Sequence, residues 1–305
     1  MSLSAPLFSI IIPLHNKGAY ILETLESLRQ QSFENWECII IENHSTDDSV
    51  QKVQSLQDSR IQLHITEAQG PCSARNAGIH LSKAPWILFL DADDLIPSHY
   101  LKAKAQIIHD QPGRGLYTCP WEERSSSGKI EQHDPFGTRV SLEEMQASSF
   151  VYPPFAIHTT VIHRNFLTPE FLWPEFMDKD LVEDAIFWFR LLYVTGIAFH
   201  DDTKAIYQTE NEKSRNQVDN IPKLYESYEK IIKTNLQFLQ NRKIKTTSRH
   251  AYYLYSFYQK MEKLSREQKL NSITSNAQAN LQKIYPQLSP WDRLKITVKK
   301  ILKKT

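Results

Sequence analysis

Three carboxyl groups stand together in Asp91-Ala92-Asp93-Asp94, directly after the apolar run WILFL at residues 86–90. Carboxylates this close repel one another, and a divalent cation among them removes that repulsion. Ligands of parallel α/β sheets bind outside the carboxyl ends of the strands, where these acids would lie if the run is a strand. The pattern therefore indicates a divalent-metal and ribose site. An acidic loop that caps the helix starting near Pro97 is the alternative.

Polar residues also follow a second apolar run, WECIII at residues 36–41, and they could recognise a nucleotide base. They are Glu42 and Asn43. A short polar side chain can accept a hydrogen bond from a base N–H or donate one to a base carbonyl. The alternative is a turn that caps a helix, with Ser45 as the N-cap residue.

Two further segments carry charged side chains beside predicted helix starts. Arg75 lies within GPCSARNAG at residues 70–78, where its guanidinium and the helix dipole would both favour a diphosphate. A surface arginine on an amphipathic helix is the alternative. Glu183 and Asp184 open the apolar segment 185–192, and a carboxylate there could act as a general base toward a hydroxyl. The alternative for this pair is a helix cap with a first-turn acid.

Hydrophobic periodicity predicts the elements that position these residues. Continuous apolar runs predict buried strands at residues 8–13, 36–41 and 86–90, and residues 60–65 are predicted as a further strand. Apolar residues at helical spacing predict helices between them, at residues 17–31, from 45, at 73–81, and from 97 to about 110. This alternation predicts an α/β fold with a mostly parallel central sheet and flanking helices.

The rest of the chain divides into two further parts. Residues 111–215 contain a predicted hairpin turn at 125–128, and we expect them to join residues 7–110 in one domain spanning residues 1–215. From residue 221 onward the pattern is helical, with an apolar stripe followed by an aromatic-rich helix around 252–258. Residues 216–305 are therefore expected to form a C-terminal helical region.

Composition excludes several classes of protein. The 305 residues have a net charge of +1, which argues against a nucleic-acid binder. Only 8 glycines occur, and neither a P-loop nor a dinucleotide-binding fingerprint is present. The 3 cysteines stand far apart, which favours reduced thiols in the cytoplasm. No secretory signal and no apolar run of about 18 residues is found, so we expect no membrane span.

The order and spacing of these segments resemble the family 2 glycosyltransferases, which have the GT-A fold. The similar stretches are residues 9–49, 70–79, 86–94 and 182–191, and the resemblance covers about residues 7–215. It implies an inverting transfer of a sugar from a nucleotide-diphospho-sugar, most simply a UDP-sugar, to an acceptor hydroxyl. Bacterial cell-surface polysaccharide or lipid-linked oligosaccharide synthesis is the implied setting, with a glycan or a lipid-linked glycan as the acceptor.

The resemblance also implies a role for each matching residue. Pro13 opens the nucleotide pocket, and Asn43, with Glu42 beside it, pairs with the base. Arg75 lies near the base and the phosphates. The remaining roles fall on the carboxylates: ribose contact by Asp91 and Asp93, Mn²⁺ or Mg²⁺ binding by Asp93 and Asp94, and general-base catalysis by Asp184 beside Glu183.

Three positions depart from the family pattern. Glu42-Asn43 replaces a usual Asp-Asp pair, and His44 replaces a usual glycine, so His44 either adopts a left-handed backbone or reshapes the turn. Glu210 stands where relatives often have a histidine near the diphosphate. A catalytically degenerate nucleotide-sugar-binding relative is therefore one alternative. A haloacid-dehalogenase-like phosphatase is another, since an apolar strand followed by Asp-x-Asp also describes its nucleophile loop.

The C-terminal segment 289–305 predicts an amphipathic helix. Ser289 can cap it and Pro290 suits its first position. Its six lysines and arginines against one aspartate give it a charge of +5. One interpretation is peripheral contact with anionic lipid on the inner face of the cytoplasmic membrane. The alternative is a helix that packs on the domain through its apolar stripe, which comprises Trp291, Leu294, Val298, Ile301 and Leu302.

Overall fold

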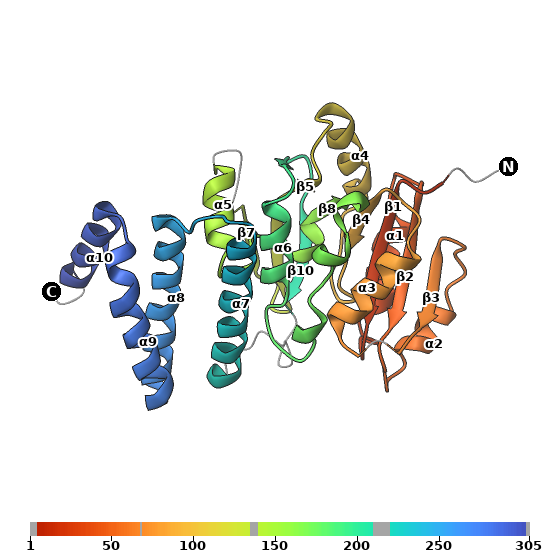
Figure 1. The fold of residues 1–305 in the computed structure, drawn as a ribbon. Coiled ribbons are helices and arrows are strands. Elements are labelled where there is room, and N and C mark those ends of the chain that lie inside the picture. The colour runs from red at the N-terminus through yellow and green to blue at the C-terminus, as the bar shows by residue number, and fades with distance from the viewer. Residues whose placement is uncertain (1–4, 68, 135–139, 210–219, 303–305) are drawn as a thin grey trace. The chain divides into compact units, whose positions relative to one another are not determined.

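The computed structural model describes residues 5–67, 69–134, 140–209 and 220–302 (Figure 1). The chain folds into two compact units. The first comprises residues 1–140, 155–179 and 191–215, and the second comprises residues 141–154, 180–190 and 216–305. The segments 141–154 and 180–190 thus fold together with the C-terminal helices, although they precede residue 215 in the chain.

The first unit is built on a seven-stranded sheet with the strand order β3-β2-β1-β4-β8-β5-β9. Neighbouring strands are parallel except where β8 pairs with β4 and β5. The predicted mostly parallel sheet is therefore confirmed. The strands are β1 (Phe8–Leu14), β2 (Trp36–Glu42), β3 (Ile61–Ile65), β4 (Trp86–Phe89), β5 (Leu116–Thr118), β8 (Thr160–His163) and β9 (Ile197–Phe199).

Helices cover both faces of this sheet, which is why β1 and β2 are continuous apolar runs (Figure 1). Even-numbered residues of β1 and β2 pack with α1, α2 and α4 in one core. Odd-numbered residues of β2 pack with α3 in a second core. The helices are α1 (Ile21–Arg29), α2 (Ser49–Gln54), α3 (Pro71–Leu81) and α4 (Tyr100–Asp110).

The predicted cap of the second helix is wrong. Helix α2 begins at Ser49, and its N-cap residue is Asp48 rather than Ser45. The hydroxyl of Ser45 accepts a hydrogen bond from the backbone N–H of Asn16 instead, at 3.1 Å. Asp47, two residues after Ser45, accepts a hydrogen bond from the backbone N–H of Ser49 at 3.0 Å. Its side chain thus has the capping role that was predicted for Ser45.

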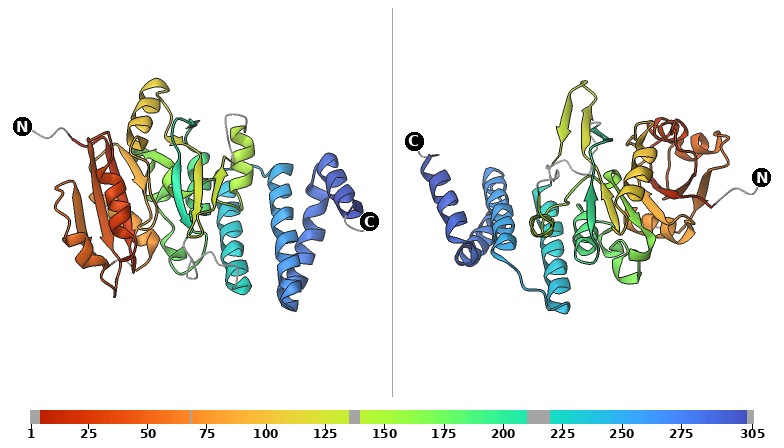
Figure 2. Two further views of the ribbon diagram at one scale, coloured as in Figure 1. Left: turned by 180° about the vertical axis from the view of Figure 1, so that it is seen from behind. Right: turned by 90° about the horizontal axis from the view of Figure 1, so that it is seen from above.

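A small second sheet belongs to the same unit. It has the order β10-β6-β7 and contains β6 (Trp121–Ser125), β7 (Ile130–His133) and β10 (Ala205–Thr209). Strands β6 and β7 form the predicted hairpin, which projects from the seven-stranded sheet in Figure 2. Four short 3₁₀ helices complete the unit, namely η1 (Ile157–Thr159), η2 (Arg164–Phe166), η3 (Pro169–Phe171) and η4 (Glu175–Met177).

The second unit is helical. Its core contains the buried rings of Phe150, Phe189, Phe238 and Phe257. Both long helices expected after residue 221 are confirmed, as α7 and α8. No helix among the described residues is both long and apolar enough to cross a membrane. Its elements are α5 (Leu142–Ser149), α6 (Asp184–Leu192), α7 (Ile221–Asn241), α8 (Ser248–Glu267), α9 (Asn271–Ile284), η5 (Tyr285–Gln287) and α10 (Pro290–Leu302).

All three cysteines are buried thiols. Cys38 lies in the centre of β2 and Cys72 in the first turn of α3, both fully enclosed. Cys119 follows β5.

Candidate functional site

The three acids after β4 each have a different partner from the chain. Asp91 accepts a hydrogen bond from Nη2 of Arg75 at 2.9 Å. Asp93 forms an ion pair with Nζ of Lys17. Asp94 accepts from the backbone N–H of Gln208 at 3.0 Å. The repulsion that the sequence predicts among these carboxylates is thus reduced within the protein itself.

Asp94 is a buried residue beneath this loop. It is 1% exposed, and its Oδ2 lies 3.1 Å from Nδ1 of the fully buried His158. Burial, reinforced by the charges of Asp91 and Asp93, raises the pKa of Asp94 well above its usual range. Burial also lowers the pKa of His158 to about 4, so the imidazole is neutral at pH 7. Asp94 therefore links the acidic loop to η1 through His158 and to β10 through Gln208.

Asp91 and Asp93 are the acids of this loop that reach the surface. Their side chains are 34% and 29% exposed. Burial raises the pKa of Asp93, while the charge of Lys17 opposes that rise. Exposed carboxylate oxygens at a strand end are the ligands that Mn²⁺ and Mg²⁺ prefer, so the residues present fit a divalent cation.

Arg75 is not a surface arginine on an amphipathic helix. It is 3% exposed, and its guanidinium lies 4.4 Å from the ring centroid of Trp173 while it donates to Asp91. Trp173 is itself 2% exposed and packs edge-on against Phe89 at 5.1 Å. The tryptophan is therefore a core residue, and the arginine orients the first acid of the loop.

The predicted base-binding residues lie at the end of β2. Asn43 is 8% exposed, and its Oδ1 accepts from the backbone N–H of Gly70 at 3.1 Å, which fixes the orientation of the amide. Glu42 accepts from the backbone N–H of Ser45 at 2.5 Å. His44 has a φ of 58°, so of the two alternatives that the sequence left open the structure has the left-handed backbone. Pro13 lies beside this edge, because it pairs with Ile41 in the register of β1 and β2.

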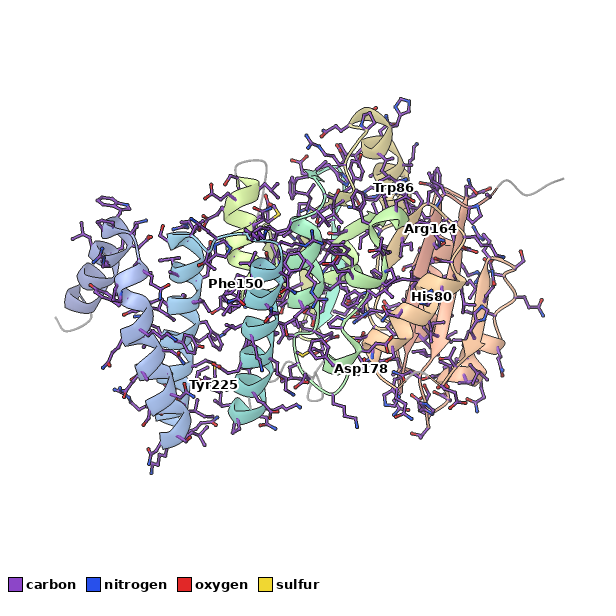
Figure 3. The ribbon with its side chains drawn as sticks, in the orientation of Figure 1. His80, Trp86, Phe150, Arg164, Asp178 and Tyr225 are labelled. Carbon is purple, nitrogen blue, oxygen red and sulfur yellow. The ribbon has the colours of Figure 1, made fainter. Side chains whose placement is uncertain are left out.

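Asp178 caps α3, a role that local sequence patterns did not indicate (Figure 3). Its carboxylate accepts from the backbone N–H of Cys72 at 2.6 Å and from the hydroxyl of Ser73. A Cβ on Gly70, which has a φ of 138°, would lie 2.3 Å from Cγ of Asp178. The approach of the acid therefore requires glycine at residue 70.

Glu183 and Asp184 belong to the second unit, so the structure does not join them with the acids after β4 in one unit. Helix α6 begins at Asp184, as predicted, and Glu183 is 9% exposed. Burial raises the pKa of Tyr228, and the charge of Asp184 adds to that rise. Asp184 therefore lies near Tyr228, which belongs to α7. Glu210 lies outside the described residues.

A second group of possible metal ligands lies on the β6–β7 hairpin and was not predicted. Ligand atoms of Glu123, Glu131 and His133 lie within 4.8 Å of one another. Glu123 and Glu131 are directly opposite in the antiparallel register, and His133 stacks on Trp121. Nε2 of His133 lies 3.2 Å from Glu123, and Lys129 forms an ion pair with Glu131, so both acids of this group have a partner on the hairpin.

Comparisons with known proteins concern the family and the fold of this chain. The model of the family described as Glycosyl transferase family 2 matches residues 9–166. A Haemophilus influenzae protein described as an uncharacterized glycosyltransferase is 37% identical over 109 residues, which are 35% of this chain and 44% of that protein. An Escherichia coli protein, described as UDP-Glc:alpha-D-GlcNAc-diphosphoundecaprenol beta-1,3-glucosyltransferase WfgD, is 37% identical over 103 residues, 33% of this chain and 41% of that protein. The matches thus span less than half the length of these relatives.

Two solved structures share the fold along most of the chain. S. aureus TarS 1-349 in complex with UDP-GlcNAc superposes with a TM-score of 0.61 at 20% identity, covering 91% of this chain and 89% of that chain. The mannosyltransferase PcManGT from Pyrobaculum calidifontis, in complex with GDP-Man and Mn²⁺, gives 0.52 at 16% identity, covering 92% and 86%. At these identities the likeness establishes the fold alone.

Proposed function

Because the chain belongs to glycosyl transferase family 2, we propose that it transfers a sugar from a nucleotide-diphospho-sugar to an acceptor hydroxyl with inversion at the anomeric carbon. The observation that carries the proposal is the edge of the sheet where β1, β2 and β4 end. Exposed carboxylates of Asp91 and Asp93 follow β4, and the oriented amide of Asn43 follows β2. Membership of this family excludes the phosphatase alternative.

Asp93 would hold the metal, with Asp91 directed toward the ribose. A bound Mn²⁺ or Mg²⁺ neutralises charge on the departing diphosphate. Arg75 holds Asp91 through its bond at 2.9 Å and has little freedom to move, since it also packs on Trp173. The sequence assigned a metal ligand to Asp94 as well, but its burial favours a supporting role beneath the loop.

The base would lie against Asn43, with Glu42 shaping the turn beside it. Since Oδ1 of Asn43 is held by Gly70, its amide group presents N–H donors, which suit a carbonyl oxygen of uracil. UDP-sugars are therefore the proposed donors. The names of the E. coli relative and of the TarS complex, which specify UDP-Glc and UDP-GlcNAc, support this choice.

Asp184 would take the proton from the attacking acceptor hydroxyl, with Glu183 beside it. Asp184 is the first residue of α6, and its carboxylate can accept a proton from a hydroxyl as a general base does. The attacking oxygen would form the new bond to the anomeric carbon while the bond to the diphosphate breaks. A metal held by Asp93 would stabilise the negative charge that develops on the leaving group, and Arg75 would hold Asp91 beside it.

A glycan or a lipid-linked glycan of the bacterial cell surface is the proposed acceptor, used at the inner face of the cytoplasmic membrane. Helix α10 supports a peripheral membrane contact. Trp291 and Leu294 are 64% and 51% exposed, so these two residues of the apolar stripe do not pack on the second unit. Asp292 and Ile296 form the packed face instead. The positive charge of residues 289–305 would add attraction to anionic lipid.

The test is a panel of UDP-, GDP-, dTDP- and CDP-sugars incubated with the full chain, with and without Mn²⁺. We expect metal-dependent release of one nucleoside diphosphate, and its loss in Asp93→Asn. Lys102→Met on the exposed side of α4 serves as the control and should behave as wild type. Binding of a nucleotide-sugar without turnover, with a range of glycan acceptors, would favour the catalytically degenerate alternative. Absence of both would refute the proposal.

A further inference from the structure

Lys17 extends from a loop whose backbone is tightly held. The backbone N–H of Lys17 donates to Ser49 at 2.9 Å, and that of Gly18 donates to Asp47 at 2.9 Å. Across the same junction, Oδ1 of Asn16 accepts from the backbone N–H of Thr46 at 2.7 Å. The start of the Lys17 side chain is therefore fixed, although its four-carbon chain remains flexible. Its ammonium group lies on Oδ2 of Asp93.

Among the described residues, this ammonium is the cation in direct contact with Asp93. Arg75 is engaged by Asp91 and Trp173 on the other side of the loop, and Asp94 is turned inward to Gln208 and His158. The Lys17–Asp93 pair is partly open to solvent, with side-chain exposures of 36% and 29%. A cation from solution can therefore reach the same carboxylate.

We propose that Lys17 is a built-in cation of the Asp93 site, which neutralises the carboxylate in the metal-free protein and competes with a divalent ion for it. The inference rests on the proposed function, because it takes Asp93 as the metal ligand. An ammonium and a divalent ion on one carboxylate repel each other. The metal therefore binds either after the lysine side chain has moved away or beside it with reduced affinity. Either way, the positive charge of residue 17 weakens metal binding.

The magnitude follows from the exposure of the pair. Partly exposed ion pairs are screened by solvent, and breaking one changes an equilibrium by a small factor. We therefore expect removal of the ammonium to tighten Mn²⁺ binding about two- to fivefold. An effect of the opposite sign would mean that the lysine orients Asp93 for the metal.

The experiment measures Mn²⁺ affinity of the full chain, without nucleotide, from the electron paramagnetic resonance of free Mn²⁺ at pH 8. Lys17→Met should bind Mn²⁺ about two- to fivefold more tightly than wild type, and Lys17→Arg, which keeps the charge, should match wild type. Asp93→Asn should lose the site. Lys129→Met is the matched control, because it removes a lysine–carboxylate pair of the same unit on the hairpin. It should leave the affinity unchanged.

Folding is checked by the thermal melting of the same proteins. Metal-free Lys17→Met should melt at a lower temperature than wild type, since Asp93 loses its counter-ion, and saturating Mn²⁺ should remove the difference. Equal or weaker Mn²⁺ binding by a folded Lys17→Met would overturn the proposal while leaving the metal site standing. If Lys129→Met alone binds Mn²⁺ more tightly than wild type, Mn²⁺ lies on the hairpin and the proposal is overturned. If neither wild type nor Lys17→Met binds Mn²⁺, the metal requirement of the proposed function falls as well.

Discussion

Substitution of Asp94 tests whether this residue is a metal ligand or supports the acidic loop from below. Asp94→Asn keeps a carbonyl oxygen where Oδ1 now accepts from the backbone N–H of Gln208 at 3.0 Å. Asp94→Ala removes that acceptor at a position where the side chain is 1% exposed. A polar group left without its partner in such a place costs about 1–3 kcal/mol of the free energy of unfolding. We expect that loss for alanine and less than about 1 kcal/mol for asparagine.

The pH dependence of this comparison has a definite sign. Burial raises the pKa of Asp94 well above its usual range, so the folded protein binds this proton more tightly than the unfolded chain does. The stability that the group contributes is complete below its unfolded pKa of about 3.9 and is lost as pH rises through the folded pKa. Asparagine carries no such proton. The stability of Asp94→Asn relative to wild type should therefore increase as pH rises above about 4.

Urea unfolding of wild type, Asp94→Asn and Asp94→Ala at pH 5 and pH 8 measures these differences, and Mn²⁺ binding by the same proteins measures the site. We expect Asp94→Asn to keep Mn²⁺ binding, whereas Asp93→Asn loses it. If Asp94→Asn abolishes Mn²⁺ binding as completely as Asp93→Asn, Asp94 is a ligand, as the sequence predicted, and the reasoning from burial is refuted. Equal stability of the asparagine and alanine variants would refute the role of the Gln208 contact.

Three further outcomes are expected. Asp184→Asn should lower kcat roughly 10²–10⁴-fold with donor affinity retained, measured in single-turnover and binding assays; loss of donor affinity instead would make Asp184 a binding residue. Asn43→Asp exchanges an N–H donor for an acceptor, which opposes a carbonyl oxygen of uracil but suits the amino group of cytosine, so the affinity for UDP relative to CDP should fall roughly tenfold in calorimetry, and an unchanged ratio would place the base elsewhere. A chain ending at Leu288 should lose salt-sensitive sedimentation with anionic liposomes, whereas equal sedimentation of both chains would end the membrane hypothesis.

The sheet is predictable where its strands are apolar runs covered on both faces. Strands β1, β2 and β4 are apolar at nearly every position, because helices pack on both sides of them. Strand β8 has a polar residue at each end and β9 has 3 residues, so neither forms such a run. Their place in the sheet depends on pairing with distant strands, which composition does not encode.

The chemically active residues are predictable from local sequence, but their partners are not. Asp91, Asp93 and Asp94 stand in one run, whereas Lys17 lies 76 residues from Asp93 and Gln208 lies 114 residues from Asp94. Asp178 reaches Cys72 across 106 residues. Such pairs are formed by tertiary packing. Local sequence therefore predicts the three acids but not the groups that reduce the repulsion among them.

The buried thiol of Cys72 allows opening of the first turn of α3 to be measured by chemical modification. A thiol reagent can modify Cys72 only when this turn opens, and opening requires the bond from its backbone N–H to Asp178 to break. Cys38, in the middle of β2, becomes accessible only when the sheet itself comes apart. The ratio of the two modification rates therefore gives the difference between the free energy of opening the sheet and that of local opening at the edge that holds Gly70 and Asn43. A nucleotide seated on this edge would slow the modification of Cys72 alone, so occupancy can be followed by mass spectrometry with neither an acceptor nor turnover.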